Sequence, residues 1–298
     1  MHKWTHHDIS DQTGRITIIT GANSGLGFAA ASALAQKNAT VIMACRNINK
    51  GEAAAAKIRA LSNDARLSVM KIDLASLSSV RKFADEFKTR FNRIDHLLNN
   101  AGVMAPPYSK TSDGFELQFG INHLGHFALT GLVLDLLLKT GNSRIVTMSS
   151  GAHYMGSMDF DNLNWGKGYS PWPAYGRSKL ANLLFTYQLQ RKLESVNTDS
   201  KALAAHPGYA ATNLQRNSFF FRIFNPLFAQ KPEKGAWPML YAATADNVRG
   251  GEYYGPDGLF QLHGHPQKVQ SSKESYNQDR AGKLWDISEK LTGISFNI

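Results

Sequence analysis

The 298-residue sequence contains a single cysteine, Cys45, and no apolar run long enough to span a bilayer. One cysteine excludes an intrachain disulfide and a thiolate metal cluster, and it is typical of a reducing, cytosolic setting. The first seven residues lack the apolar core of a secretory signal peptide. We therefore expect a cytoplasmic protein with a substantial hydrophobic core.

Dense blocks of lysine and arginine are also absent, although the formal net charge is +10. Without such blocks or a basic–aromatic repeat, nucleic-acid binding is not expected. The charge is that of a basic surface, and a positive field also favours an anionic phosphorylated cofactor. The histidines at positions 2, 6 and 7 are more typical of a solvated terminus than of a metal site, so no metal is expected.

A glycine-rich turn follows the first apolar run of the chain. Residues 16–19 are isoleucine-rich, as in a buried strand, and residues 28–37 are mainly small helix formers. Between them, Gly21, Gly25 and Gly27 let the backbone turn sharply and approach a ligand. The helix N-terminus offers free N–H groups to a pyrophosphate. The pattern predicts dinucleotide binding; the alternative is that the glycines serve packing alone.

The second predicted strand, residues 40–45, ends at Arg46 and Asn47. In a dinucleotide-binding fold this position faces the adenosine ribose, where an acidic residue would accept hydrogen bonds from the hydroxyls. The planar guanidinium of Arg46 is instead suited to a 2′-phosphate. The sequence therefore favours NADP(H) over NAD(H), with a solvent-exposed loop arginine as the alternative.

Strands and helices alternate along most of the chain. Strands are predicted at residues 16–19, 40–45, 67–72, 94–98, 144–148, 201–205 and 250–258, and helices at 28–37, 50–61, 77–91, 115–138, 175–193 and 234–245. This order predicts an α/β fold with a doubly wound parallel sheet and right-handed connections. No composition break divides the chain, so residues 1–298 are expected to form a single domain.

Polar and small residues gather where strands end and on two of the helices. Tyr175 and Lys179 are four residues apart and share one helix face. Asn122 lies on a predicted buried helix and needs polar partners there. His123 and His126, on the same helix, are interpreted as hydrogen-bonded helix-face histidines rather than bases. The strand ends carry Asp73-Leu74, Asn99-Asn100-Ala101-Gly102, Ser149-Ser150 and His206-Pro207-Gly208.

Together these motifs resemble the short-chain dehydrogenase/reductase family over about residues 12–260. Those that follow the family's order are Thr20-Gly21-x3-Gly25-x-Gly27, Asn99-Asn100-Ala101-Gly102, Asn122, Ser150, Tyr175-x3-Lys179 and Pro207-Gly208. Residues 122–127, 175–182 and 206–208 look most like the branch of retinol dehydrogenases, WW-domain oxidoreductases and light-dependent protochlorophyllide reductases. The resemblance implies a seven-stranded parallel sheet of the Rossmann type, a nicotinamide cofactor and carbonyl/alcohol chemistry.

The resemblance also implies catalytic roles for four residues. Tyr175 exchanges the proton, and Lys179 lowers the pKa of Tyr175 and bonds the nicotinamide ribose. Ser150, preferred over Ser149, orients the substrate oxygen, and Asn122 holds a water that links Lys179 to solvent. The implied cofactor-binding residues are Gly21, Asn23, Ser24, Gly25, Leu26, Gly27, Arg46, Asn47, Asp73, Leu74, Asn100, Ala101, Gly102, Tyr175, Lys179, Pro207, Gly208 and Thr212.

Residues 209–235 are expected to border the substrate. The Phe-rich part, residues 219–228, has four interpretations: a lid over a lipophilic substrate, a peripheral membrane contact, a subunit contact in a homo-oligomer, or ordinary core. A lid or a peripheral contact is preferred. Trp165 and Trp172, between the serine pair and Tyr175, either wall the substrate pocket or cap a surface loop.

These observations favour an NADPH-dependent oxidoreductase that transfers a hydride between nicotinamide and a carbonyl or alcohol of a lipophilic small molecule. A light-dependent ring reductase is the first alternative, and the single cysteine counts against it. A nicotinamide-sensing protein without turnover is the second, and the presence of both Tyr175 and Lys179 counts against it. The walls of such pockets are variable loops, so the sequence indicates only the class of substrate.

Overall fold

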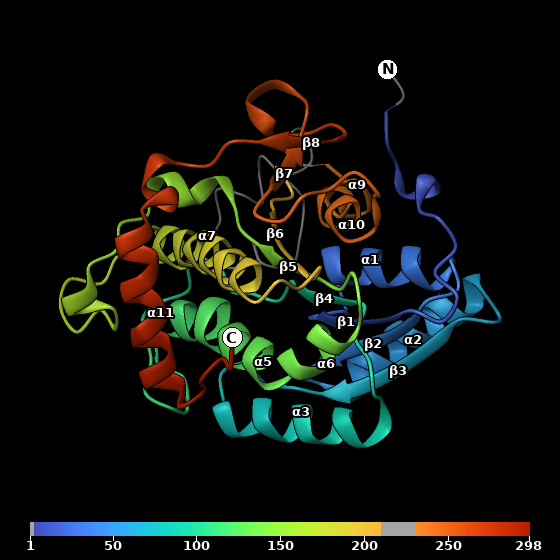
Figure 1. The fold of residues 1–298 in the computed structure, drawn as a ribbon, viewed down its shortest axis with the longest axis horizontal. Helices are drawn as coiled ribbons and strands as arrows, with labels where there is room; N and C mark the ends of the chain where they lie inside the picture. The colour runs from blue at the N-terminus through green and yellow to red at the C-terminus, as the bar shows by residue number, and fades with distance from the viewer. Residues whose placement is uncertain (1–2, 210–229) are drawn as a thin grey trace.

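An eight-stranded sheet runs through the middle of the protein, in the order β3-β2-β1-β4-β5-β6-β7-β8 (Figure 1). The computed structural model describes residues 3–209 and 230–298. The first seven strands pair in parallel, and β8 pairs antiparallel with β7. The strands are β1 Ile16–Thr20, β2 Thr40–Cys45, β3 Arg66–Lys71, β4 His96–Asn99, β5 Arg144–Met148, β6 Lys201–Ala205, β7 Tyr253–Pro256 and β8 Pro266–Val269.

The doubly wound parallel sheet expected from the sequence is thus confirmed, with one addition. The sequence predicts seven strands, and β8 is an eighth on the outer edge. Two of its four residues, Gln267 and Lys268, are polar and exposed. An edge strand of this kind is held by its register with β7 rather than by burial, so it carries no apolar alternation that would reveal it.

Helices cover both faces of the sheet because neighbouring strand residues point in opposite directions. Ile19 packs into the cluster that includes α1, α2 and α10, whereas Ile18 packs into the cluster that includes α3, α5, α6, α7 and α11. The helices are α1 Gly25–Ala35, α2 Ile48–Leu61, α3 Leu77–Arg90, α4 Leu117–Phe119, α5 Gly125–Leu132, α6 Leu134–Lys139, α7 Pro171–Ser195, α9 Pro232–Gly235, α10 Trp237–Thr244 and α11 Gln278–Thr292. Within the described residues, none of these helices combines the length and hydrophobicity needed to cross a bilayer.

The segment expected to be one long helix, residues 115–138, is broken in two places. A π-helical turn, Gly120–Leu124, separates α4 from α5, and Val133, at ψ 9°, separates α5 from α6. At the π-helical turn, the backbone of Leu74 lies so close that a Cβ on Gly125 would be 2.6 Å from the Leu74 carbonyl oxygen. Single-turn π-helices often occur at functional sites, and this one carries Asn122.

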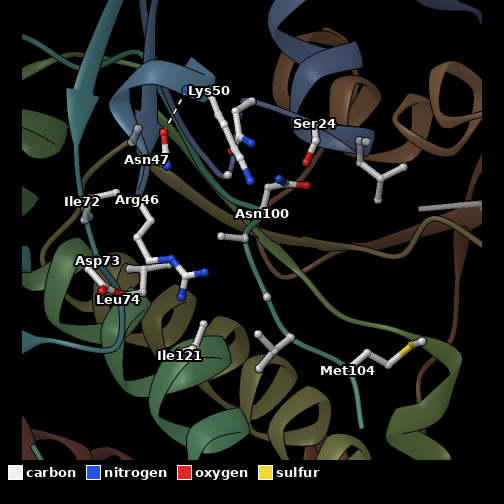
Figure 2. A pocket seen from close by; sticks show the side chains of 18 of the residues that line it. Ser24, Arg46, Asn47, Lys50, Ile72, Asp73, Leu74, Asn100, Met104 and Ile121 are labelled. Atoms are coloured by element: carbon white, nitrogen blue, oxygen red, sulfur yellow. Dashed lines mark hydrogen bonds between the residues drawn. The ribbon is translucent and has the colours of Figure 1, made fainter. Parts of the chain in front are cut away.

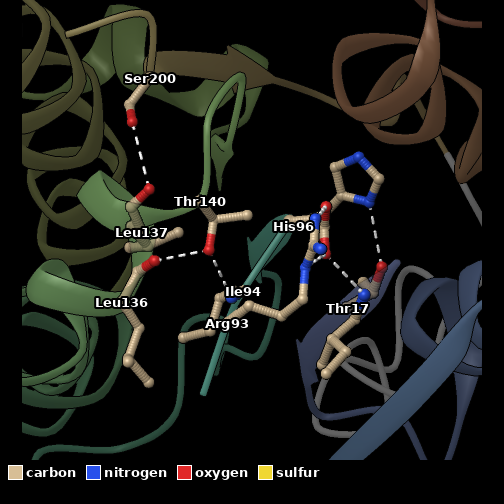
Figure 3. Close-up of polar contacts among 10 residues, drawn as sticks. Thr17, Arg93, Ile94, His96, Leu136, Leu137, Thr140 and Ser200 are labelled. Atoms are coloured by element: carbon tan, nitrogen blue, oxygen red, sulfur yellow. Dashed lines mark hydrogen bonds and ion pairs between the residues drawn. The ribbon is translucent and has the colours of Figure 1, made fainter. Parts of the chain in front are cut away.

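At the N-terminal ends of the strands, buried polar groups form hydrogen bonds and ion pairs with one another. The Oγ1 of Thr17 lies 3.0 Å from Nδ1 of His96, and Arg93 forms an ion pair with Asp95, two residues later (Figure 3). The Thr140 hydroxyl donates to the carbonyl of Leu136 and accepts from an amide of the turn before β4. Burial lowers the pKa of His96 to about 3, so its ring is neutral. These contacts join the N-terminal ends of β1 and β4 to the end of α6.

The carboxyl ends of the strands lie on the opposite side of the sheet from these contacts. Between β1 and β4 the order of the strands in the sheet reverses direction. The loop after β1 turns towards α1, on one face of the sheet, and the loop after β4 continues towards the other face. In doubly wound sheets ligands bind in the crevice at this point, beyond the carboxyl ends of the strands. The fold therefore places the turns after β1, β2, β3 and β4 around one crevice.

Candidate active site

A cleft of about 490 Å³ opens at this crevice (Figure 2). Most of the cofactor-binding residues predicted from the sequence line it: Gly21, Asn23, Ser24, Gly25, Leu26, Arg46, Asn47, Asp73, Leu74, Asn100, Ala101 and Gly102. Residues that the sequence did not indicate also line it: Ala44, Lys50, Ile72, Val103, Met104, Pro106 and Ile121. The turns of four strands, distant in sequence, therefore build one site.

The three glycines of the first turn have different roles. Gly21 and Gly25 have φ angles of +69° and +56°, which side chains rarely allow. A Cβ on Gly27 would lie 2.5 Å from the carbonyl oxygen of Gly21 and 2.6 Å from Nδ2 of Asn100. Gly27 does not line the cleft, so packing explains this glycine, while Gly21 and Gly25 shape the wall.

Thr20, the last residue of β1, holds the turn after β4. Its Oγ1 accepts hydrogen bonds from the amides of Asn100 and Ala101, both at 2.9 Å. The Nδ2 of Asn100 in turn donates to the Thr20 carbonyl at 2.8 Å. The two turns that line the centre of the cleft are therefore fixed against each other.

Two cations project into the cleft, one from the turn after β2 and one from the start of α2 (Figure 2). Arg46 follows the strand directly, and Lys50 lies four residues later, on the first turn of α2. Asn47 caps that helix, because its side chain accepts the Lys50 amide at 2.9 Å. Within the described residues, no ion pair involves Arg46 or Lys50. Their spacing, Arg-x3-Lys at a helix start, was the signal in the sequence that would have revealed Lys50.

The two adjacent serines after β5 have different hydrogen-bond partners. Ser149 is buried, and its Oγ donates to the Lys179 carbonyl at 2.9 Å. Ser150 begins a 3₁₀ helix, Gly151–Met155, and its side chain hydrogen-bonds the Tyr175 hydroxyl. The Ser149 hydroxyl thus supports the backbone of α7, and this geometry favours Ser150 as the serine that meets a substrate.

Tyr175 and Lys179 lie on α7 as their spacing predicts. The Nζ of Lys179 is 5.7 Å from the centre of the Tyr175 ring. Burial lowers the pKa of Lys179 to about 8 and raises the pKa of Tyr175 to about 12, although the hydrogen bond with Ser150 opposes the second shift. Burial therefore sets the direction of the Tyr175 pKa, and the lowering of this pKa by Lys179 stays a prediction. At neutral pH the phenol is protonated and able to donate.

Asn122 connects the π-helical turn to both sides of the site. Its Oδ1 accepts the Val103 amide at 2.8 Å, and its Nδ2 donates to the Val103 carbonyl and to Oγ of Ser178. A Cβ on Gly102 would lie 3.0 Å from Oδ1 of Asn122 and 3.7 Å from Nζ of Lys179. Asn122 therefore lies beside Lys179 as expected, with its side chain engaged by the backbone. The water-holding role stays a prediction.

His153, which the sequence did not single out, holds the backbone of Ser150. Its Nδ1 donates to the Ser150 carbonyl at 2.6 Å, and its Nε2 accepts the Ser272 amide at 3.0 Å. Burial lowers the pKa of His153, which keeps the ring neutral, as this pair of contacts requires. The ring therefore ties the serine turn to the segment after β8.

Pro207 and Gly208, which follow β6, lie outside the cleft lining. Gly208 has a φ of +65°, and a Cβ there would be 2.4 Å from the Leu262 carbonyl. The next residue, Tyr209, donates its amide to the same carbonyl at 2.7 Å. Here the glycine is required by close packing. Thr212 and the Phe-rich stretch 219–228 lie outside the described residues.

The two tryptophans before Tyr175 have different environments. The Arg177 guanidinium lies 4.3 Å from the centre of the Trp165 ring and donates to the Asn162 carbonyl at 2.7 Å. Trp165 thus anchors its loop to α7. The ring of Trp172 stands nearly perpendicular to that of Tyr175, 6.2 Å between centres. Of the two, only Trp172 neighbours the phenol.

Comparison with known proteins is consistent with this site. A family model described as short chain dehydrogenase matches residues 15–220. Retinol dehydrogenase 12 from Mus musculus is 40% identical over 289 residues, covering 95% of this chain and 88% of that protein. Retinol dehydrogenase 14 from Homo sapiens is 41% identical over 303 residues, covering 94% and 87%. A crystal structure of an uncharacterized Mycobacterium paratuberculosis protein superposes with a TM-score of 0.85, at 44% identity and full coverage of both chains.

Proposed function

The chain belongs to the short chain dehydrogenase family and is an NAD(P)-dependent dehydrogenase of alcohol and carbonyl groups, and we propose that it prefers NADPH and a lipophilic substrate. One observation carries the catalytic part of this proposal. The protonated Tyr175 hydroxyl hydrogen-bonds Ser150, with Lys179 on the same helix face. This arrangement lies next to the cleft that the glycine turn and Arg46 line.

The lining of the cleft supports a nicotinamide dinucleotide with a 2′-phosphate as its ligand. The turn after β1 has glycines at positive φ, and a Cβ on Gly21 would lie 3.1 Å from the Cβ of Ala101. Arg46 and Lys50 would flank the phosphate, and Arg46 offers a planar pair of donors to it. When bound there, the dinucleotide would supply or accept the hydride. Two cations where an NAD-binding protein has a carboxylate support the preference for NADPH.

The residues of the chain supply the proton chemistry. As hydride reaches a carbonyl carbon, negative charge develops on the oxygen and needs a donor. Tyr175 donates the proton, because its raised pKa keeps the phenol neutral. Ser150 donates a hydrogen bond to the same oxygen and orients it. Lys179 is 5% exposed, so its charge acts in a medium that screens it weakly.

The lipophilic substrate is supported by two lines of argument. The relatives at about 40% identity are named retinol dehydrogenases, whose printed substrate is a long apolar alcohol. In this chain the cleft wall beyond Gly102 is apolar, formed by Val103, Met104 and Pro106. We therefore favour a long-chain or polyene aldehyde over a small polar ketone.

A peripheral membrane contact is a second proposal, favoured by one specific observation. Leu259 and Phe260, on the loop before β8, are 71% and 83% exposed, and apolar side chains so exposed often mark contact sites. The loop is joined to Tyr209 through the Leu262 carbonyl. Sedimentation with phospholipid vesicles tests this contact, which Phe260→Ser should weaken; equal sedimentation of both proteins would reject it.

Oxidation of NADPH with a panel of substrates tests the proposed function. The panel contains all-trans-retinal, long-chain aldehydes, short ketones and quinones, each assayed with NADPH and with NADH in the dark. We expect turnover of the long apolar aldehydes with NADPH. Activity that required light would favour a ring reductase, and nucleotide binding without turnover of any compound would favour a nicotinamide sensor.

A further inference from the structure

His126 is buried at 1% exposure between the cofactor cleft and the segment that carries Asn122. Its Nε2 lies 2.9 Å from Oγ1 of Thr20, and its Nδ1 lies 3.1 Å from the Asn122 carbonyl oxygen. Thr20 ends β1 and Asn122 lies in the π-helical turn. The His126 ring therefore bridges β1 and the π-helical turn. Thr20 and His126 are 106 residues apart in the sequence.

The donors and acceptors around this ring allow one arrangement of protons. A carbonyl oxygen only accepts, so Nδ1 carries the proton and donates to Asn122. Burial, together with the charge of Lys179, lowers the pKa of His126 to about 4, so Nε2 is unprotonated and accepts from the Thr20 hydroxyl. The same Thr20 oxygen accepts the amides of Asn100 and Ala101. The Leu98 carbonyl oxygen also lies 3.3 Å from Oγ1 of Thr20, but the shorter 2.9 Å contact with Nε2 takes the hydroxyl proton, and both lone pairs accept the amides.

We propose that His126 is a positioning residue whose neutral Nδ1–H form couples the turn that lines the cofactor cleft to the segment that aligns Asn122. The coupling continues past Asn122, because the Asn122 side chain donates to Oγ of Ser178, which donates to the Tyr175 carbonyl at 2.7 Å. This inference rests on the proposed function, since it assigns the two ends of the ring to cofactor binding and to turnover.

The two nitrogens are expected to have separable effects. The Nε2 contact fixes the direction in which Thr20 presents its lone pairs to the Asn100 and Ala101 amides, so its loss should weaken nucleotide binding. The Nδ1 contact fixes the backbone of Asn122, so its loss should slow turnover. A residue that merely fills space would not separate these quantities.

His123 is a matched control on the same segment. It is also 1% exposed, and burial lowers its pKa to about 3. Its Nε2 contacts Oγ of Ser288 on α11 at 2.9 Å, and its ring also interacts with the side chain of Asn182. Replacing His123 therefore perturbs a histidine of equal burial and removes no side-chain hydrogen bond to Thr20 or to Asn122.

The experiment compares His126→Asn, His126→Gln and His123→Gln in the full chain. The asparagine amide reaches the position of Nδ1 and the glutamine amide reaches that of Nε2. For each variant we would measure the dissociation constant for NADPH by fluorescence, kcat with retinal, and the midpoint of thermal unfolding. We expect His126→Asn to weaken NADPH binding by about tenfold and His126→Gln to lower kcat by about tenfold, the effect of losing one buried hydrogen bond. For His123→Gln we expect only a lower unfolding midpoint.

Imidazole ¹⁵N shifts give a readout that needs no activity. They should show His126 protonated at Nδ1 and unprotonated at Nε2 from pH 6 to pH 9. A proton on Nε2 would overturn the inference. So would equal losses of NADPH affinity and kcat in the two His126 variants, if these losses followed only the lowered unfolding midpoint, as expected for His123→Gln. A wild-type protein that shows the expected tautomer but turns over no carbonyl would contradict the proposed function instead.

Discussion

The Nζ of Lys179 donates a 3.0 Å hydrogen bond to the carbonyl oxygen of Met148, the last residue of β5. The same oxygen accepts from Nδ2 of Asn182 at 2.9 Å. The lysine is thus held against the strand end that leads into Ser149 and Ser150. Burial disfavours the charged ammonium group there, and it therefore lowers the pKa of Lys179 from 10.5 to about 8.

Lys179→Met should abolish turnover and yet stabilise the fold at pH 7. The depressed pKa means that the charged form destabilises the folded state by up to about 3 kcal/mol below pH 8. The hydrogen bond lost with the charged Lys179 is worth about 1.5–3 kcal/mol, and Asn182 still serves the Met148 carbonyl. We therefore expect a gain of up to about 2 kcal/mol in the free energy of unfolding, measured with urea.

The sign of this effect also predicts its pH dependence. Between pH 8 and pH 10.5 the unfolded state binds more protons at this lysine than the folded state does, so wild-type stability rises with pH. The advantage of Lys179→Met should shrink over the same interval. Lys57→Met, on the exposed face of α2, is the control and should change stability by less than about 0.5 kcal/mol. A variant of Lys179 that is less stable than wild type at pH 7 would contradict this account.

The pH profiles of the two reaction directions should differ. Carbonyl reduction needs the proton of Tyr175, whose pKa is raised to about 12, so the reactive form is fully populated at neutral pH. Alcohol oxidation needs the ionised phenol, which becomes more populated as pH rises. We expect kcat for oxidation to increase from pH 7 to pH 10, and kcat for reduction to be level up to about pH 8, where Lys179 loses its proton. An oxidation rate independent of pH over this range would rule out Tyr175 as the titrating group.

The adjacent serines should give different results when each loses its hydroxyl. Ser150→Ala removes the partner of the Tyr175 hydroxyl, so kcat should fall by about a hundredfold, and loss of the hydrogen bond from the Ala152 amide should lower stability by about 1 kcal/mol. Ser149→Ala removes a buried hydrogen bond to the Lys179 carbonyl and should lower the free energy of unfolding by about 1–2 kcal/mol. Steady-state kinetics and urea unfolding on both variants make the comparison. Loss of turnover in Ser149→Ala alone would reverse the assignment.

Charge in the turn after β2 should determine the preferred dinucleotide. Arg46→Asp removes the planar donor and adds a carboxylate suited to ribose hydroxyls, so preference should shift from NADPH towards NADH. Lys50→Met should weaken the affinity for NADPH by about tenfold and change the affinity for NADH by less than about twofold, because we expect Lys50 to contact only the 2′-phosphate, which NADH lacks. Competitive binding of both nucleotides to each variant gives the ratio. Lys57→Met, on the same helix but exposed away from the cleft lining, is the control. Unchanged ratios in Arg46→Asp would show that this arginine does not contact the phosphate.

Much of the fold was predictable because its signals are local. The runs of β-branched residues, the turn glycines and the Tyr175–Lys179 spacing each depend on neighbours in sequence, and they gave the parallel sheet and its crevice. The π-helical turn at Asn122 and the edge strand β8 depend on contacts between distant segments, so no local pattern revealed them.

The same distinction separates the parts of the site. Arg46 was recognisable from its place after a strand, whereas His153 and His126 acquire their roles only when the fold brings a carbonyl and a hydroxyl or amide to their two nitrogens. The raised pKa of Tyr175 could not be predicted for the same reason, since the four-residue spacing indicates the nearby lysine and not the burial of the phenol.

The central claim is that Tyr175 protonates the oxygen of a carbonyl as hydride arrives from a bound nicotinamide. The most direct measurement uses NADPH deuterated at C4 with retinal or another accepted aldehyde, followed by mass spectrometry of the alcohol, for wild type and Tyr175→Phe. We predict deuterium on the carbinol carbon with wild type, and for Tyr175→Phe a rate lower by at least about a hundredfold with NADPH affinity within about twofold. Deuterium transfer by Tyr175→Phe at the wild-type rate would contradict the claim.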